Sequence, residues 1–165
     1  MDLFNSLINS SNFDIIIIFL IAAAPIGELR FSIPYGLLLT NIPHITVIFV
    51  SITGNILAGI FIIYIFPLII NILSKISLID KIYNRIISRT YSKSAVIQKR
   101  KYYGLIFFVS LPFPFTGVWT GALASNLIGL SKHKSIIAII LGVCISATAV
   151  TSMVYLGIFT INSIQ

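Results

Sequence analysis

Two charged residues, Glu28 and Arg30, lie in an apolar stretch that prolines and glycines interrupt. Glu28 is the only glutamate of the chain, and Arg30 is the only basic residue before Lys75. A charged side chain near the centre of a bilayer costs about 2.5–3.5 kcal/mol on insertion scales, so such residues are typical of functional sites. A guanidinium group suits a phosphate or a carboxylate, and a buried carboxylate can carry a proton.

The break around these charges is predicted to separate two half-helices. Pro25 and Gly27 are expected to end the first, and Glu28 to begin the second, where the helix dipole favours a carboxylate. Arg30 is expected to face away from Glu28, because residues two apart do not share a helix face. Pro34 has no N–H to donate to the carbonyl of Arg30. The alternative is that Glu28 and Arg30 only hold the hairpins together.

A second break, with neither acid nor base, interrupts a later apolar run. Its prolines and glycines are expected to expose backbone groups, its threonines offer hydroxyls, and its tryptophan walls or packs a cavity. The candidate site residues there are Pro112, Pro114, Thr116, Gly117, Trp119, Thr120 and Gly121.

The remaining reactive residue types form no catalytic or metal-binding pattern. His44 and His133 lie in polar turns and are expected at the surface, and Cys144 lies in an apolar run and is expected to be buried and inert. One glutamate, two distant histidines and one cysteine do not have the spacing of a metal site. No nucleophile–base arrangement and no cofactor fingerprint is visible, so we expect neither an enzyme nor a cofactor.

Composition excludes a soluble protein. Of 165 residues, 58% are hydrophobic and 9% are charged, which is too little to build a polar surface. Eight of the eleven Lys and Arg residues lie between Lys75 and Lys101, and two more are Lys132 and Lys134. A nucleic-acid-binding protein needs a solvated basic face, so we expect no nucleic acid partner. The clusters instead predict the cytoplasmic side of a membrane protein.

The chain is predicted to be an all-α integral membrane protein built from two inverted repeats. Repeat 1 (13–73) and repeat 2 (103–160) each contain a broken run followed by an uninterrupted one, Ile45–Leu73 and Ile136–Phe159, long enough to span a bilayer. Basic and apolar residues alternate at helical spacing in the linker (74–102), which predicts an amphipathic helix on anionic lipids.

Each broken run is predicted to be a re-entrant helical hairpin. Four crossings would place the two basic clusters on opposite sides, whereas two hairpins and two spanning helices place residues 75–101 and 132–134 together in the cytoplasm. Both termini then lie outside the plasma membrane, and the hairpin tips can meet near the midplane. Two spanning helices shield the non-helical backbone of the hairpin tips poorly from lipid. We therefore expect a homodimer surrounded by membrane lipids.

Two motifs resemble those of the small multidrug export protein family. Pro25 to Gly36, with Glu28-Leu29-Arg30 and Pro34, is similar to its P-x-x-E-L-R-x-x-x-P-x-G signature, although Gly27 stands where a larger apolar residue is usual. Pro112 to Gly121 resembles its second signature, with Phe115 where glycine is usual. The resemblance implies transport and a distant relation to the DedA (VTT-domain) proteins, which have paired re-entrant hairpins and include lipid flippases.

Three functions remain open. The first is a flippase in which Arg30 and the second break hold an anionic headgroup, such as a polyprenyl phosphate or a phospholipid, and Glu28 exchanges a proton. The second is a proton-coupled exporter of amphipathic cations, with Glu28 as the counter-charge. The third is a membrane scaffold that transports nothing. Loss of Arg30 should harm an anion binder more than a cation exporter.

Overall fold

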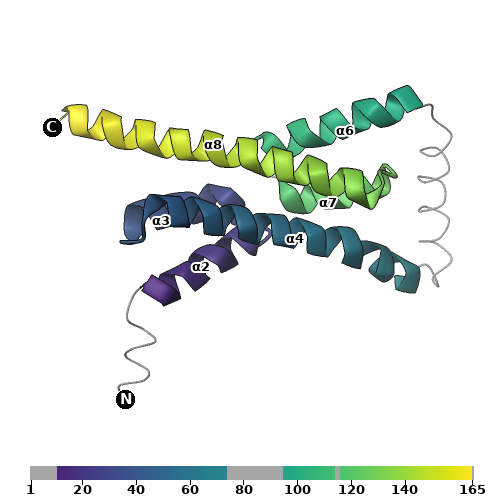
Figure 1. Cartoon of the computed structure of the whole chain (residues 1–165), viewed down its shortest axis with the longest axis horizontal. Helices are drawn as coiled ribbons and strands as arrows, with labels where there is room; N and C mark the ends of the chain where they lie inside the picture. Colours follow the sequence, from purple (N-terminus) through teal and green to yellow (C-terminus); the bar gives the residue numbers. More distant parts are fainter. Residues whose placement is uncertain (1–10, 74–94, 114–115, 165) are drawn as a thin grey trace, which may run out of the picture. The chain divides into compact units, whose positions relative to one another are not determined.

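The computed structural model describes residues 11–73, 95–113 and 116–164. These ranges form helices and no strands, as an all-α protein requires (Figure 1). The helices are α2 (Ser11–Ala23), α3 (Glu28–Leu39), α4 (His44–Leu73), α6 (Ala95–Ser110), α7 (Val118–Leu127) and α8 (Lys132–Ile164).

Two of these helices are long and apolar enough to cross a membrane. They cover His44–Ile70 of α4 and Lys132–Ile161 of α8, the two runs that the sequence predicts to span. Pro43 directly precedes α4, and its carbonyl accepts hydrogen bonds from the N–H groups of Thr46 and Val47. Proline thus stands directly before the first residue of this helix, where its missing N–H costs no hydrogen bond.

The basic amphipathic helix predicted within residues 74–102 lies mostly outside the described residues. Residues from Ala95 onward belong to α6, which continues without interruption into the apolar run that begins at Tyr103. Whether the broken runs are re-entrant, and whether the two repeats are inverted, stay predictions.

The chain divides into two compact units, each described here by itself. The first comprises residues 1–57 and 144–165, and the second comprises residues 58–143. Both α4 and α8 therefore contribute to both units.

In the first unit, α2 and α3 pack along each other and α4 packs against both (Figure 1). Ile18 and Ala22 of α2 are fully buried. A Cβ added at Gly54 of α4 would lie 2.9 Å from the carbonyl oxygen of Phe19 and 3.2 Å from Cβ of Ala22, so Gly54 allows α2 and α4 to touch. Gly36 of α3 likewise allows α3 to touch Val47 of α4.

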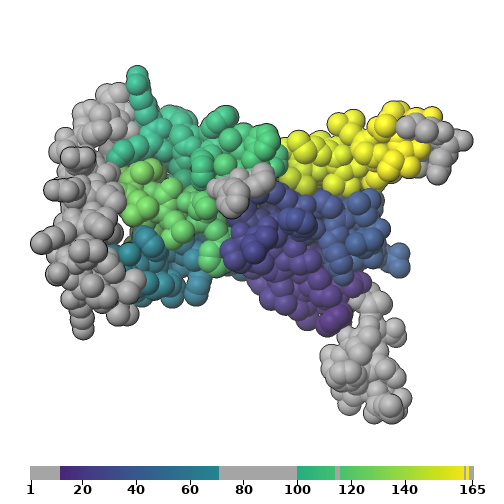
Figure 2. Space-filling view, turned by 180° about the vertical axis from the view of Figure 1, so that it is seen from behind, coloured from purple at the N-terminus to yellow at the C-terminus, as the bar shows by residue number. Residues whose placement is uncertain are grey.

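The C-terminal part of α8 completes this unit. Nδ1 of His44 and the Tyr155 hydroxyl share a hydrogen bond of 2.7 Å, which joins the start of α4 to α8. Beyond it, Leu156, Phe159 and Ile161 are exposed. The C-terminal part of α8 is the yellow end of the chain in Figure 2. An exposed apolar helix end is expected of a segment that lies in lipid.

In the second unit, glycines again mark close approaches between helices. A Cβ at Gly121 of α7 would lie 2.5 Å from Cγ2 of Val109, and one at Gly142 of α8 would lie 2.7 Å from Cβ of the same valine. Gly59 of α4 contacts Val118 and Ile139 in the same way. Gly54 and Gly59 of α4 are thus both positions of close helix packing.

Two local expectations are wrong. His133 does not lie in a polar turn, because α8 already begins at Lys132. The carbonyl of Ser131 accepts hydrogen bonds from the N–H and the hydroxyl of Ser135. Cys144 is exposed rather than buried, because Val143 and Ala147 carry the buried face of α8 at this level. His44 and His133 are exposed, as predicted.

Candidate functional site

The first break separates α2 from α3, and the chain reverses tightly within it. The N–H of Ala24 donates to the carbonyl of Ile21, and the N–H of Glu28 donates to the carbonyl of Ala24. A Cβ added at Gly27 would lie 2.6 Å from the carbonyl oxygen of Ile21, so this position requires glycine. Pro25 lies exposed within the break. Pro25 and Gly27 thus separate the half-helices as predicted.

Glu28 begins α3 in an unusual conformation. Its φ angle is +50°, the only positive φ among the described residues that are not glycine. Its side chain is only 8% exposed, although it carries a carboxylate. A left-handed residue that is not glycine costs about 1–2 kcal/mol, and such strain clusters at functional sites. The backbone thus points to the same residue as the charge pattern does.

Arg30 lies two residues further along α3 and is half-buried. Burial disfavours its positive charge, and the Coulombic attraction of the Glu28 carboxylate offsets part of that effect. Whether the Arg30 side chain faces away from Glu28 stays a prediction.

An apolar groove lies along α3 from Phe31 onward, directly after Arg30. Pro34, four residues after Arg30 and on the same helix face, lies inside α3 and lines a pocket of about 330 Å³. Residues of α3 supply most of the lining and Ile21 of α2 the rest; the full set is Ile21, Phe31, Pro34, Tyr35, Leu38 and Leu39. A cationic side chain thus precedes an apolar groove on one helix.

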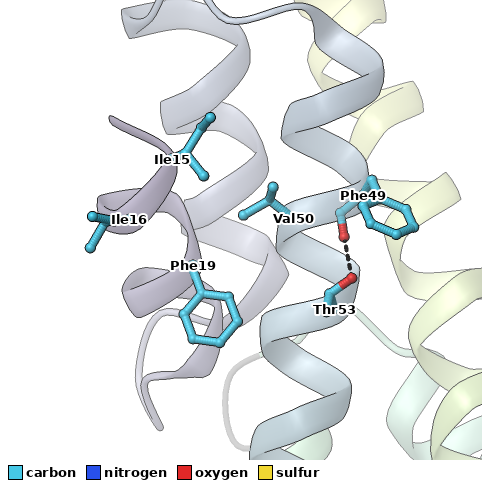
Figure 3. A pocket seen from close by; sticks show the side chains of 6 residues that line it. All are labelled: Ile15, Ile16, Phe19, Phe49, Val50 and Thr53. Carbon is cyan, nitrogen blue, oxygen red and sulfur yellow. Dashed lines mark hydrogen bonds between the residues drawn. The ribbon is translucent and has the colours of Figure 1, made fainter. Parts of the chain in front are cut away.

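A further pocket of the first unit carries no charge. It measures about 250 Å³ and lies between α2 and α4, lined by Ile15, Ile16, Phe19, Phe49, Val50 and Thr53 (Figure 3). Its only side-chain hydroxyl, on Thr53, donates to the carbonyl of Phe49 at 2.8 Å within α4 (Figure 3). This pocket offers apolar surface and no group that would orient a ligand.

The second break uses its polar groups to close its own loop. The Thr116 hydroxyl donates to the carbonyls of Leu111 and Phe113 at 2.9 and 2.8 Å, and the Thr120 hydroxyl donates to the carbonyl of Gly117 at 3.4 Å. Gly117 has a φ of +156° and precedes α7. The hydroxyls of Thr116 and Thr120 thus both donate to backbone carbonyls of their own break.

The other predicted residues of this break have packing or structural positions. The N–H of Gly121 donates to the carbonyl of Gly117 inside α7, and Gly121 lies against Val109. Trp119 and Pro112 are half-buried. Pro114 lies outside the described residues.

The predicted site residues fall into two separate groups. Pro25, Gly27, Glu28, Arg30 and Pro34 gather around one break in the first unit. Those of the second break belong to the second unit. A meeting of the two breaks at the membrane midplane stays a prediction.

Sequence reasoning missed three buried polar side chains of the first unit. Ser32, Ser51 and Asn55 are at most 1% exposed. The available signal was their spacing, because Ser32 follows Glu28 by four residues and Asn55 follows Ser51 by four in apolar helices.

Comparison with known proteins gives one finding. Residues 28–149, which are 122 of the 165, match the sequence model of a family described as "Putative small multi-drug export protein". Searches of curated proteins and of solved structures gave no significant match. The matched range begins at Glu28, includes Arg30, and contains α3, α4 and the second break.

Proposed function

The chain belongs to the small multi-drug export protein family, and from that premise we propose that it transports an anionic amphipathic molecule, such as a polyprenyl phosphate or a phospholipid. The family and the two apolar helices support a membrane transporter rather than an enzyme. The finer assignment is carried by one observation, the position of Arg30 directly before the apolar groove of α3.

The two charges of the first break differ in their access to a ligand. Glu28 is buried, whereas Arg30 is half-buried and thus the easier to reach. An anionic headgroup that binds the guanidinium of Arg30 would replace its attraction to Glu28. The released carboxylate then becomes the natural group to take up a proton, because an unpaired buried charge is costly.

The groove accounts for the apolar part of the substrate. Its walls are aliphatic and aromatic, and its volume of about 330 Å³ accommodates part of a lipid chain rather than a whole one. Headgroup binding at Arg30 and chain binding along α3 would orient the substrate along the helix.

A second candidate function is export of amphipathic cations, and the burial of Glu28 favours it. A cation would then displace Arg30 from the carboxylate, and Glu28 would alternate between substrate and proton. The two candidates differ in which charge they require.

Ligand-dependent thermal stability of the purified full chain tests these proposals. The panel contains a polyprenyl phosphate, an anionic phospholipid and a lipophilic cation, with wild type, Arg30→Ala, Glu28→Gln and Arg100→Ala. Arg100 is an exposed arginine outside the break and so is the matched control. We expect the phosphate lipid to raise the Tm of wild type and Arg100→Ala, and to lose this effect in Arg30→Ala. Stabilisation by the cation alone, lost only in Glu28→Gln, would contradict the first proposal and favour the second.

A further inference from the structure

Three buried oxygen atoms of the first unit have no hydrogen-bond partner among the residues that the structure describes. They are Oγ of Ser32, Oγ of Ser51 and Oδ1 of Asn55, on side chains that are 0%, 0% and 1% exposed. A fourth such atom, Oγ1 of Thr151, belongs to a separate groove between α4 and α8. Buried polar groups in native proteins are almost always satisfied, so three together point to a bound species.

The register of α3 against α4 brings these residues onto facing surfaces. The two helices run in opposite directions across the short connection between Leu39 and His44, and Gly36 contacts Val47. Steps of four residues remain on one helix face. Ser32 is one step back from Gly36, and Ser51 is one step on from Val47, so these two serines lie opposite each other.

One more step along each helix adds an acid and an amide. Glu28 lies one step back from Ser32, and Asn55 lies one step on from Ser51. By the same count, Glu28 at the first position of α3 is level with Asn55 of α4. The result is a ladder of four polar residues, all of them buried, across one helix pair.

The C-terminal end of α2 approaches the same level. Gly54, the neighbour of Asn55, lies against Phe19 and Ala22, and α2 ends at Ala23. The C-terminus of a helix carries the negative end of its dipole. The negative pole of α2 therefore lies close to the level of Gly54 and Asn55 in α4.

We propose that Glu28, Ser32, Ser51 and Asn55 form a binding site for one small monovalent metal cation, with Na⁺ as the ion to test. Carboxylate, amide and hydroxyl oxygens are the ligands of hard cations. The site holds a single carboxylate, and Arg30 already balances part of its charge. One partly balanced negative charge suits a monovalent ion better than a divalent one.

In the transporter this ion would compete with the proton for the carboxylate of Glu28 and would be the coupling ion when it is bound. In that sense the inference rests on the proposed function. Binding itself does not require transport. Na⁺ contacts oxygens of α3 and α4, whereas the anionic substrate contacts Arg30 and the groove, so either site can fail alone.

The test is the Tm of the purified full chain as NaCl replaces choline chloride at constant ionic strength, with KCl as a parallel series. The variants are Ser51→Ala and Ser32→Ala, and the control is Ser125→Ala. Ser125 is an equally buried serine of the second unit, but its hydroxyl donates to the carbonyl of Ala122 at 2.8 Å.

We expect the wild-type Tm to rise saturably with Na⁺ and less with K⁺. Each ladder variant should weaken the apparent Na⁺ affinity by about tenfold, because it removes one of the oxygen atoms that bind the cation. Ser125→Ala should keep the wild-type affinity. No saturable Na⁺ effect in wild type would overturn the proposal, even if a variant fails to fold. Wild-type affinity in both ladder variants would overturn it too, and would leave water as the partner of these oxygens.

Discussion

Gly36 of α3 and Val47 of α4 lie so close that a Cβ on residue 36 would overlap the valine side chain. The same added Cβ would lie 3.1 Å from Cδ1 of Ile18, so Gly36 is the point at which α2, α3 and α4 meet. This contact fixes the register of α3 against α4, and the buried polar ladder follows from it.

Gly36→Ala should therefore destabilise the protein by about 1–3 kcal/mol, the usual cost of forcing an extra methyl group into a packed core. The measurement is the Tm of the purified variant. Gly157→Ala is the matched control, because a Cβ at Gly157 meets nothing within 4 Å and alanine favours the helix by up to about 1 kcal/mol. Equal Tm values for the two variants would contradict the packing described here.

The sequence predicts much of this architecture because apolar length and proline–glycine breaks are strong local signals. The extent of α4 and the separation of α2 from α3 at Pro25 and Gly27 follow from such signals. The ladder does not, because it depends on which helix faces meet. The conformation of Glu28 could not be predicted either, since a positive φ at glutamate arises from the tight reversal and not from its own preference.

The hydrogen-bond partners of the hydroxyls in the second break could not be predicted from the sequence either. The sequence shows that Thr116 and Thr120 can donate hydrogen bonds but not to which acceptor. In the structure both donate to nearby backbone carbonyls, as short polar side chains in loops commonly do.

Tyr155→Phe should weaken the attachment of α8 to the start of α4. It removes the hydroxyl that shares a 2.7 Å hydrogen bond with His44, and both side chains are exposed, so we expect a loss of about 0.5–1 kcal/mol. Thermal unfolding checks this, with Tyr103→Phe as control at another exposed tyrosine. A smaller loss in Tyr155→Phe than in Tyr103→Phe would be inconsistent with the contact.

Lys101→Met should destabilise the second unit. Nζ of Lys101 donates to the carbonyl of Ile128 at 2.8 Å, which ties α6 to the end of α7. A partly buried hydrogen bond from a charged donor contributes about 1.5–3 kcal/mol. Lys134→Met, at an exposed lysine, is the control. Equal Tm values for Lys101→Met and Lys134→Met would mean that the hydrogen bond of Lys101 does not contribute to stability.

Cysteine labelling tests the predicted re-entrant hairpins. Cys144 is exposed, so it is first replaced by alanine, and a single cysteine is then introduced as Lys134→Cys. Two hairpins place residue 134 on the cytoplasmic side together with residues 75–101. An impermeant thiol reagent should therefore label it in inverted vesicles and not in intact cells. Labelling from outside would instead indicate four crossings.

Transport by the full chain in liposomes tests the central claim most directly. A fluorescent anionic lipid is placed in both leaflets, and its movement is followed by quenching from outside in vesicles with wild type, Arg30→Ala or Arg100→Ala. We predict that wild type and Arg100→Ala move the lipid and that Arg30→Ala slows it at least tenfold, the loss expected for one charged contact. Equal rates in wild type and Arg30→Ala, or no movement above empty liposomes, would contradict the assignment of Arg30 as the headgroup-binding residue.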